Sequence, residues 1–356
     1  MPPRPELVVD GKNELGEGVL WSPAHGEVQW TDIFGRRFFS YRPSDGAVRS
    51  VALPDRLACF APHGATSLLA GFASGLEVFD LESGARRPIV AVEPDRPTTR
   101  VNDGKLDRRG RLVFGTMDED PGHQPIGRVY SYDGGASPRA LISSVRISNS
   151  IAFSPDGRRM YFADTPTKVI RCYDYDPDSG DLSGERTFAE VKGPGAPDGS
   201  TVDADGCLWN AEWGGGRVVR YTPDGRVDRA IALPCAQVTC CAFGGAGLDQ
   251  LFVTTARTGL DGAALAGQPQ AGALFVIEAS VVGLADTPFP RPVFRLAVER
   301  SGFVRCDGAA ERREAFRRNA ACSDVRSYCI TFSHPGRAQG LSRQTDNVGG
   351  LNVERP

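Results

Sequence analysis

The sequence predicts an all-β chain that forms a six-bladed β-propeller with four-stranded blades, followed by an atypical C-terminal tail. Three observations support this fold class. Strand–turn–strand segments recur along most of the chain, glycine and proline account for 42 and 26 of the 356 residues, and no long stretch has the period of an amphipathic helix. Glycine and proline favour tight turns, so their recurrence between short apolar runs indicates β-hairpins.

Six hairpins carry the repeat. Each consists of a short strand-like run, a turn rich in proline, aspartate and glycine, and a second apolar run. Their first residues lie 39 to 49 residues apart, and a repeat of about 40 to 50 residues is typical of a propeller blade. In chain order, the hairpins are residues 17–33, 56–72, 102–118, 149–165, 198–213 and 239–255.

Further strand–turn–strand stretches lie between these hairpins, so each repeat supplies about four strands. Two packed β-sandwiches are the alternative architecture, but the even spacing of the four-strand units favours the propeller. The intervening stretches are residues 37–53, 76–90, 127–142, 169–189 and 217–233.

Composition narrows the range of functions. The chain is 40% hydrophobic and 24% charged, with a formal net charge of −3, which is ordinary for a soluble globular protein. The near-neutral charge argues against a nucleic-acid-binding surface, and no apolar run approaches the ~18 residues of a membrane helix. The N-terminus lacks the charged and apolar regions of a signal peptide. We therefore expect a cytoplasmic protein without a nucleic-acid, membrane or obligate protein partner.

Cysteine and histidine spacing, together with missing motifs, excludes several kinds of site. The sequence holds nine cysteines and four histidines but no C-x-x-C, H-x-H or H-x-x-x-H spacing. We expect reduced, mostly buried thiols and no histidine-rich zinc site. Cys240 and Cys241 have no histidine nearby in the sequence and are interpreted as core residues rather than nucleophiles. The absence of G-x-S-x-G, P-loop and G-x-G-x-x-G motifs weakens serine-hydrolase, nucleotide and dinucleotide functions.

Polar residues begin the six hairpins. The ends of the innermost strands of a propeller face its central channel, so residues that share one position in the repeat surround one mouth of the channel. Glu17, Asn149 and Asp198 supply two carboxylates and an amide oxygen, and each is followed by glycine or serine. An alternative is that they end the inner strands and bind ordered water. The six first residues are Glu17, Arg56, Asn102, Asn149, Asp198 and Thr239.

Oxygen ligands of this kind suit a hard divalent cation such as Ca²⁺, Mg²⁺ or Mn²⁺, and Zn²⁺ or Fe²⁺ is tolerated. Three protein ligands leave coordination positions for water and substrate, as in a catalytic metal site. Arg56, Arg100 and Asn102 add hydrogen-bond donors for an oxygen-rich substrate. Three acids at the ends of second strands are expected to bond the backbone of a neighbouring blade: Asp32, Asp164 and Glu212.

Several stretches resemble one known family. They are "LGEGVLW", "RVNDGKLDRRGRLVFGTMDED", "ISNSIAFSPDGRRMYFADT" and "PDGSTVDADGCLWNAEWGGGRVVRYTPDG", and "FVTTARTGL" fits the last blade. Over about residues 5–297 the chain is similar to the regucalcin (senescence marker protein)/gluconolactonase/luciferin-regenerating-enzyme-like family of sugar lactonases. The resemblance implies a propeller domain over residues 1–297 with one divalent metal cation (Ca²⁺, Zn²⁺, Mn²⁺, Mg²⁺ or Fe²⁺) at the channel mouth. It implies hydrolysis of a small-molecule sugar lactone to its aldonic acid in sugar catabolism. The alternative is a calcium-binding, regucalcin-like or scaffold propeller without turnover.

The resemblance also implies the metal ligands. They match Glu17, Asn149 and Asp198, and Asp198 additionally matches the catalytic residue that transfers a proton. One departure lies beside Asn149, because Ser150 stands where the family often has glycine.

The substrate-binding residues implied by the resemblance are Arg100, Asn102 and one acid. Arg100 lies two residues ahead of Asn102, so both point to the same face of a strand. The acid matches Asp120 by spacing, or Glu119 if a gap intervenes.

The last part of the chain, residues 298–356, has no blade pattern. It contains three cysteines and many arginines. We expect a tail that is disordered or loosely attached.

Overall fold

The computed structural model describes residues 4–289, 296–298, 304–306, 344–348 and 351–355. The chain divides into two units, Met1–Leu296 and Ala297–Pro356. In the C-terminal part, β25 (Leu296–Val298) pairs with β26 (Val304–Cys306), and β27 (Gln344–Val348) pairs with β28 (Leu351–Arg355). The predicted disordered tail lies mostly outside the described residues.

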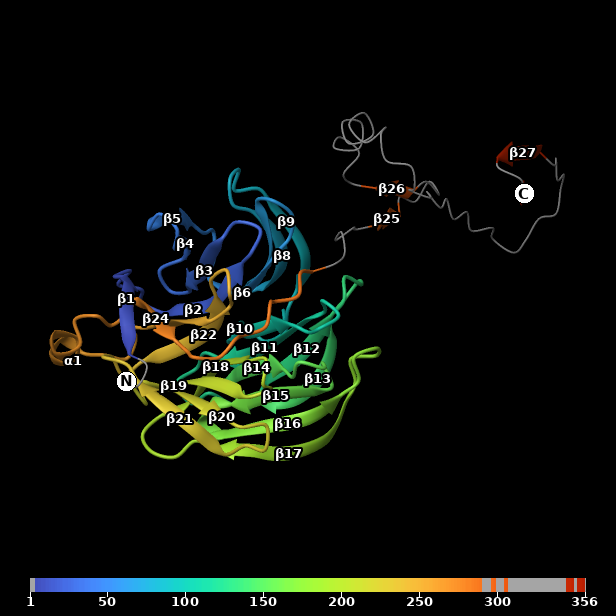
Figure 1. Cartoon of the computed structure of the whole chain (residues 1–356). Coiled ribbons are helices and arrows are strands. Elements are labelled where there is room, and N and C mark those ends of the chain that lie inside the picture. Colours follow the sequence, from blue (N-terminus) through green and yellow to red (C-terminus); the bar gives the residue numbers. More distant parts are fainter. Residues whose placement is uncertain (1–3, 290–295, 299–303, 307–343, 349–350, 356) are drawn as a thin grey trace. The chain divides into compact units, whose positions relative to one another are not determined.

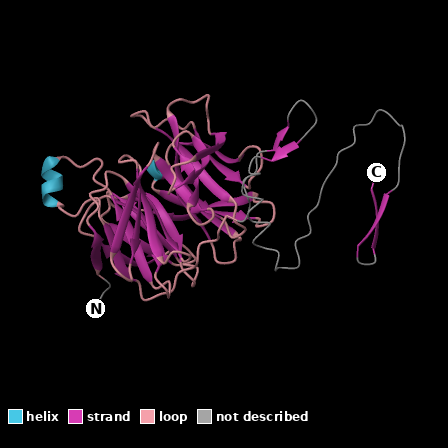
Figure 2. Ribbon diagram, turned by 90° about the horizontal axis from the view of Figure 1, so that it is seen from above, coloured by secondary structure: helices cyan, strands magenta, loops and turns pink. Residues whose placement is uncertain are grey.

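The predicted propeller is confirmed. The described part of the chain contains six antiparallel four-stranded sheets, which are the blades, and strands dominate its regular structure (Figures 1 and 2). From the innermost strand outward, blade 1 consists of β2 (Gly16–Ser22), β3 (Glu27–Asp32), β4 (Arg37–Arg42) and β5 (Ala47–Ala52). Blade 2 consists of β6 (Leu57–Pro62), β7 (Ser67–Phe72), β8 (Gly75–Asp80) and β9 (Arg86–Ala91). Blade 3 consists of β10 (Thr99–Leu106), β11 (Leu112–Asp118), β12 (Gly127–Tyr132) and β13 (Arg139–Val145). Blade 4 is β14 (Ser148–Phe153), β15 (Arg159–Asp164), β16 (Val169–Tyr175) and β17 (Leu182–Glu190); blade 5 is β18 (Ala196–Val202), β19 (Leu208–Trp213), β20 (Arg217–Tyr221) and β21 (Val227–Ala232); and blade 6 is β22 (Val238–Gly244), β23 (Gln250–Thr255), β24 (Leu274–Glu278) and β1 (Pro5–Val9).

Blade 6 departs from the sequence prediction. The sixth repeat supplies only its three inner strands, and the N-terminal strand β1 pairs antiparallel with β24 to form the fourth (Figure 1). The expectation of four strands from every repeat is therefore wrong for the sixth. Pairing the first strand with the last repeat closes the ring by backbone hydrogen bonds and covers an edge that would otherwise be exposed.

Separate apolar clusters lie between adjacent blades. Successive side chains of a strand point to opposite faces of its sheet, so each blade packs against both neighbours. On β14, for example, Ile151 and Phe153 pack with residues of blade 3, whereas Ala152 packs with residues of blade 5. Six cysteines are buried and free, as expected: Cys59, Cys172, Cys207, Cys235, Cys240 and Cys241.

Short elements complete the described fold. The 3₁₀ helix η1 (Thr165–Thr167) follows β15, and α1 (Gly262–Gly267) lies between β23 and β24, with the side chain of Asp261 accepting from the N–H of Ala264. None of the helices in the described residues has the length and apolar character needed to cross a membrane.

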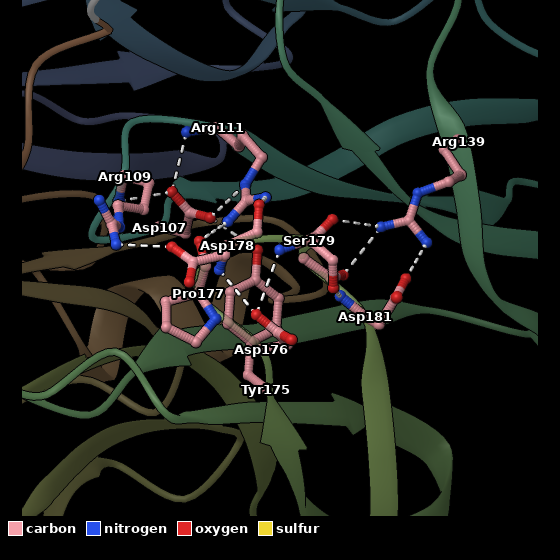
Figure 3. Close-up of polar contacts among 11 residues, drawn as sticks. Asp107, Arg109, Arg111, Arg139, Tyr175, Asp176, Pro177, Asp178, Ser179 and Asp181 are labelled. Carbon is pink, nitrogen blue, oxygen red and sulfur yellow. Dashed lines mark hydrogen bonds and ion pairs between the residues drawn. The ribbon is translucent and has the colours of Figure 1, made fainter.

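A polar network joins blades 3 and 4 (Figure 3). Asp107, in the β10–β11 turn, accepts from Arg111 Nε at 2.7 Å and from Tyr175 Oη at 2.6 Å. Arg139 of β13 pairs with Asp181, in the turn between β16 and β17, at 2.7 Å. We call this network the blade 3–4 clamp; its one buried carboxylate, Asp107, faces both an arginine and a tyrosine hydroxyl.

The segment after β24 crosses the end of the channel at which the inner hairpins turn. Gly283 donates to the carbonyl oxygen of Leu248 at 2.7 Å, and Asp286 lies 3.8 Å from Lys105 Nζ. Phe289 then stacks on Tyr132 with ring centroids 6.3 Å apart. Contacts with blades 3 and 6 therefore hold this segment against the channel, opposite the mouth where the inner strands begin.

Candidate active site

A β-bulge near the start of each inner strand shapes the channel mouth. Between Glu17 and Leu20 the strand advances three residues while its partner β3 advances two, and the same irregularity follows Asn149 and Pro197. A bulge inserts one unpaired residue and turns the neighbouring side chain away from the regular pleat. Glu17 and Asn149 are the last paired residues before the bulges of blades 1 and 4, whereas Asp198 lies one residue further on, inside the bulge of blade 5.

Two of these bulges need a left-handed backbone. Gly18 has φ +60° and Ser150 has φ +62°. Glycine adopts this conformation freely, whereas a serine is strained there by about 1 to 2 kcal/mol. The Ser150 hydroxyl bonds Ser200 Oγ at 2.7 Å, and both side chains are buried. In blade 5, glycine is required at position 199 for a different reason, because a Cβ there would lie 2.8 Å from Cys240 Cα.

Three carboxylates share the mouth without matching positive charge. Withdrawal from water, reinforced by the charge of Asp103, raises the pKa of Glu17 to about 8. Asp198 is 5% exposed, and its burial, followed by the charges of Glu17 and Asp103, raises its pKa well above the ordinary value. Burial raises the pKa of Asp103 to about 6. Within the described residues, Glu17 and Asp198 form no ion pair, so both retain the capacity to bind a cation or a proton.

Asp103 was missed by the sequence analysis. Its carboxylate accepts from the N–H of Ile151 at 3.0 Å and from the N–H of Gly104 at 2.8 Å, and it lines the channel cavity. A usable signal was present, because Asp103 is an acid followed by glycine on an inner strand, as Glu17 and Asp198 are.

A chain of hydrogen bonds crosses the mouth from blade 3 to blade 5. Arg100 Nη1 donates to Asn102 Oδ1 at 2.7 Å, and Asn102 Nδ2 donates to Asn149 Oδ1 at 3.1 Å. Asn149 Nδ2 donates to Thr165 Oγ1 at 2.8 Å, and Thr165 Oγ1 donates to the carbonyl oxygen of Pro197 at 2.9 Å. We call this chain the mouth belt. It brings together three of the sequence-predicted residues, Arg100, Asn102 and Asn149.

Glu119, rather than Asp120, contacts the belt. Arg100 Nε donates to Glu119 Oε1 at 3.1 Å, and Arg56 Nη2 donates to Glu119 Oε2 at 2.9 Å. Asp120 is exposed, and its N–H bonds the Asp118 side chain. The Glu119 side chain is 31% exposed, so it remains accessible to a substrate.

Arg100 forms the floor of this part of the mouth. It is 4% exposed, and burial lowers its pKa to about 10 against the opposing effect of Glu119. Its guanidinium carbon lies 5.8 Å from the ring centroid of Phe34, which is 39% exposed. A substrate at the mouth therefore meets an apolar ring beside the charged groups.

Two expectations about the repeat are wrong. Thr239 does not face the open mouth: it is fully buried and donates to the carbonyl oxygen of Gly16, because its bulge lies between Val238 and Cys240. Glu212 pairs with the Arg217 side chain at 2.7 Å instead of bonding the backbone of a neighbouring blade.

The other two acids of this set do bond backbone, but in the segment that leads into their own blade rather than in a neighbouring blade. Asp32 accepts from the N–H groups of Glu14 and Leu15. Asp164 accepts from those of Arg146 and Ile147. They hold the segments that lead into the inner strands.

A narrow cavity of about 50 Å³ continues from the mouth into the channel. Gly18, Asp103, Ser200 and Cys240 line its upper part, and Lys105 and Asp286 lie at its other end. The space suits water rather than a sugar.

The donor set of the mouth fits a hard cation. No group of three or more His, Cys, Asp or Glu side chains in the described residues has the arrangement of a metal site. The oxygen donors of the sequence-predicted site are the carboxylates of Glu17 and Asp198 and the amide oxygen of Asn149. Two carboxylates that lack ion pairs and one oriented carbonyl oxygen are the ligands that Ca²⁺ and similar ions take. The raised pKa values of Glu17 and Asp198 show that positive charge there would be favourable.

Known proteins are similar to this chain over most of its length. The family model described as SMP-30/Gluconolactonase/LRE-like region matches residues 15–257. L-arabinolactonase of Azospirillum brasilense is 44% identical over 289 residues, covering 80% of this chain and 94% of that protein. The 6-deoxy-6-sulfogluconolactonase of Pseudomonas putida is 34% identical over 286 residues, covering 80% and 98%.

A solved structure shows the same architecture. The calcium-binding protein regucalcin from Agrobacterium tumefaciens superposes with a TM-score of 0.76 at 32% identity, covering 80% of this chain and 97% of that one. The match spans the propeller, and the relatives are similar over nearly their whole length. This chain therefore belongs to the SMP-30/gluconolactonase/LRE-like family, as its motifs indicated.

Proposed function

We propose that this protein hydrolyses a sugar lactone to the open-chain aldonic acid in sugar catabolism, with the help of one divalent cation. The observation that carries the proposal is the pair of carboxylates, Glu17 and Asp198, which stand without ion pairs beside a fixed belt of hydrogen-bonding groups. The 44% identity to L-arabinolactonase supports a lactone as the substrate class.

Glu17, Asn149 and Asp198 are the residues that would hold the cation. When bound, a divalent cation supplies positive charge that polarises a carbonyl and makes water more acidic. In this proposal Asn149 would use Oδ1, which accepts from Asn102 Nδ2 and has a second lone pair, since Asn149 Nδ2 donates to Thr165.

Asp198 is the proposed proton acceptor. Water attacks the lactone carbonyl carbon, the carboxylate of Asp198 takes a proton from that water, and the bond between the carbonyl carbon and the ring oxygen breaks. The same proton then passes to the departing ring oxygen, which becomes a hydroxyl. A carboxylate whose pKa is raised is a more effective base than one in free solution, and in the metal-free chain burial raises the pKa of Asp198 above its ordinary value.

Arg100 and Glu119 are the groups proposed to hold sugar hydroxyls. The bonds of Arg100 Nε and Nη1 to Glu119 and Asn102 fix the plane of the guanidinium. The partly exposed carboxylate of Glu119 would accept hydrogen bonds from sugar hydroxyls, so a hydroxylated ring is preferred over an apolar ester.

Acid release from a panel of pentono- and hexonolactones tests the proposal. We expect turnover of at least one sugar lactone when Ca²⁺, Mn²⁺ or Zn²⁺ is present and loss of turnover after chelation. Absence of cation-dependent hydrolysis across the panel would reject the proposal.

A second candidate is a calcium-binding propeller without turnover. It is favoured by the similarity to the structure of a calcium-binding regucalcin. Calcium binding by a protein that releases no acid from any lactone would support it.

The proposed substrate is a small molecule. The composition supports action in the cytoplasm without a nucleic-acid, membrane or obligate protein partner. Cell fractionation with an antibody to the native protein checks the compartment.

A further inference from the structure

The mouth belt has a fixed direction of donation. Arg100 can only donate hydrogen bonds, so the side-chain oxygen of Asn102 must face it, and the amide nitrogen of Asn102 must face blade 4. Asn102 Nδ2 accordingly donates to Asn149 Oδ1 at 3.1 Å and to the carbonyl oxygen of Ser148 at 2.9 Å. One end of the belt therefore requires Asn149 to present its oxygen toward Asn102.

The other end imposes the same orientation independently. The carbonyl oxygen of Pro197 can only accept, and the single hydroxyl proton of Thr165 is given to it at 2.9 Å. Thr165 Oγ1 is then available to Asn149 only as an acceptor, so it must face Asn149 Nδ2, at 2.8 Å. Reversal of the Asn149 amide would place two acceptors against each other at this contact.

Thr165 is itself held firmly. Its N–H donates to the carbonyl oxygen of Ile147 at 3.0 Å, while Asp164 Oδ1 accepts from the N–H of Ile147 at 3.0 Å. These bonds join the start of η1 to the residue two positions before Asn149. The hydroxyl also reaches the next blade at Pro197, the residue directly before Asp198, so one side chain spans blades 4 and 5.

We propose that Thr165 is a positioning residue that fixes the amide of Asn149 with its oxygen toward the cation and ties this amide to the strand that carries Asp198. This inference rests on the proposed cation site, although not on which substrate is turned over. Partners that orient metal ligands typically account for about 10- to 100-fold in affinity or activity.

The test uses the full chain with three substitutions. Thr165→Val keeps the shape of the side chain and removes both hydrogen bonds, Thr165→Ser keeps the hydroxyl, and Thr167→Val is the matched control. Thr167 lies in the same 3₁₀ helix and is exposed, and its hydroxyl bonds only the backbone of Asp164 and Val169.

Binding of Mn²⁺ alone, followed by electron paramagnetic resonance, is the primary measurement. We expect Thr165→Val to weaken Mn²⁺ binding by about 10-fold or more, and Thr165→Ser and Thr167→Val to stay within about 3-fold of the parent chain. Thermal unfolding of the metal-free proteins separates this effect from a general loss of stability. We expect Thr165→Val to melt at the same temperature as Thr167→Val and nevertheless to bind Mn²⁺ more weakly.

Equal Mn²⁺ affinity in the parent chain and Thr165→Val would overturn the inference, and so would failure of the parent chain to bind Mn²⁺. If Thr165→Val binds weakly and Thr165→Ser restores binding, while no lactone is hydrolysed, the lactonase proposal fails and the role of Thr165 stands. Where turnover is present, a drop in kcat for Thr165→Val at saturating Mn²⁺, with KM retained, further supports positioning of the ligand rather than of the sugar.

Discussion

The channel mouth and the blade 3–4 clamp both withdraw carboxylates from water, but they treat the charges differently. In the clamp, Asp107 is fully buried and its oxygens face Arg111 and Tyr175 at hydrogen-bond distance. At the mouth, Glu17 and Asp198 have no ion-pair partner among the described residues, and both pKa values are raised. Burying a charge is costly unless it is paired. The clamp therefore stabilises the fold, whereas the mouth retains a destabilising arrangement that a bound cation would relieve.

The largest expected effect is on turnover, from Asp198→Asn. Removing the proposed proton acceptor should lower kcat/KM for a lactone by about 100-fold or more at saturating cation. The same change removes an unpaired charge, so the metal-free variant should melt at or above the temperature of the parent chain at pH 8. Undiminished turnover would show that another group takes the proton.

The matching substitution in the clamp should have the reverse effect. Asp107→Asn leaves the partly buried Arg111 without its counter-charge, so the free energy of unfolding should fall by about 3 kcal/mol, while kcat/KM stays near that of the parent chain. Denaturation by urea measures this change. Asp178→Asn is the control, because Asp178 pairs with Arg109 in the same clamp but is 81% exposed and should change stability by less than about 1 kcal/mol. Equal losses from the two substitutions would contradict the comparison.

The pH dependence of stability should reveal the unpaired acids. The pKa of Glu17 is raised from an ordinary 4.5 to about 8 in the folded chain, so between these values the unfolded chain has released a proton that the folded chain retains. The metal-free protein should therefore lose stability as the pH rises from about 5 to about 8. Melting temperatures in the presence of a chelator measure the loss. Glu17→Gln should flatten this dependence, and parallel curves for the two proteins would refute the assignment.

The smallest expected effects come from the strained serine at the mouth. Ser150→Ala keeps the left-handed backbone and loses the bond to Ser200, so it should cost about 1 kcal/mol. Ser150→Gly loses the same bond but relieves a strain of about 1 to 2 kcal/mol, so it should be the more stable of the two variants. Thermal unfolding compares them; a less stable Ser150→Gly would show that the backbone at this bulge is not strained.

The sequence predicted the propeller and three equivalent mouth residues because both follow from a regular repeat. Glu17, Asn149 and Asp198 stand at bulges of the same form in blades 1, 4 and 5, so one alignment finds all three. Residues whose position depends on a local irregularity were not found in this way. In blade 6 the bulge directs the Thr239 side chain into the interface with blade 1, where it donates to the carbonyl oxygen of Gly16. In blade 3, Asp103 follows a bulge that begins at Val101.

The repeat pattern also does not predict contacts between segments that are distant in the sequence. The choice between Glu119 and Asp120 depends on how the chain leaves β11, and Arg56 of another blade determines which of the two approaches Arg100. The sequence pattern does not predict a role for Thr165, because the proposed role depends on a hydrogen-bond acceptor in the next blade, the carbonyl oxygen of Pro197. Hydrogen-bond direction across blades is a property of the assembled ring rather than of any single repeat.

Closure of the ring by β1 has a consequence for synthesis on the ribosome. The strand made first, Pro5–Val9, pairs with Leu274–Glu278, so its partner emerges only after nearly all of the propeller has been translated. Contacts of such large sequence separation form slowly. Until then β1 has no partner strand, so blade 6 is the blade that is completed last.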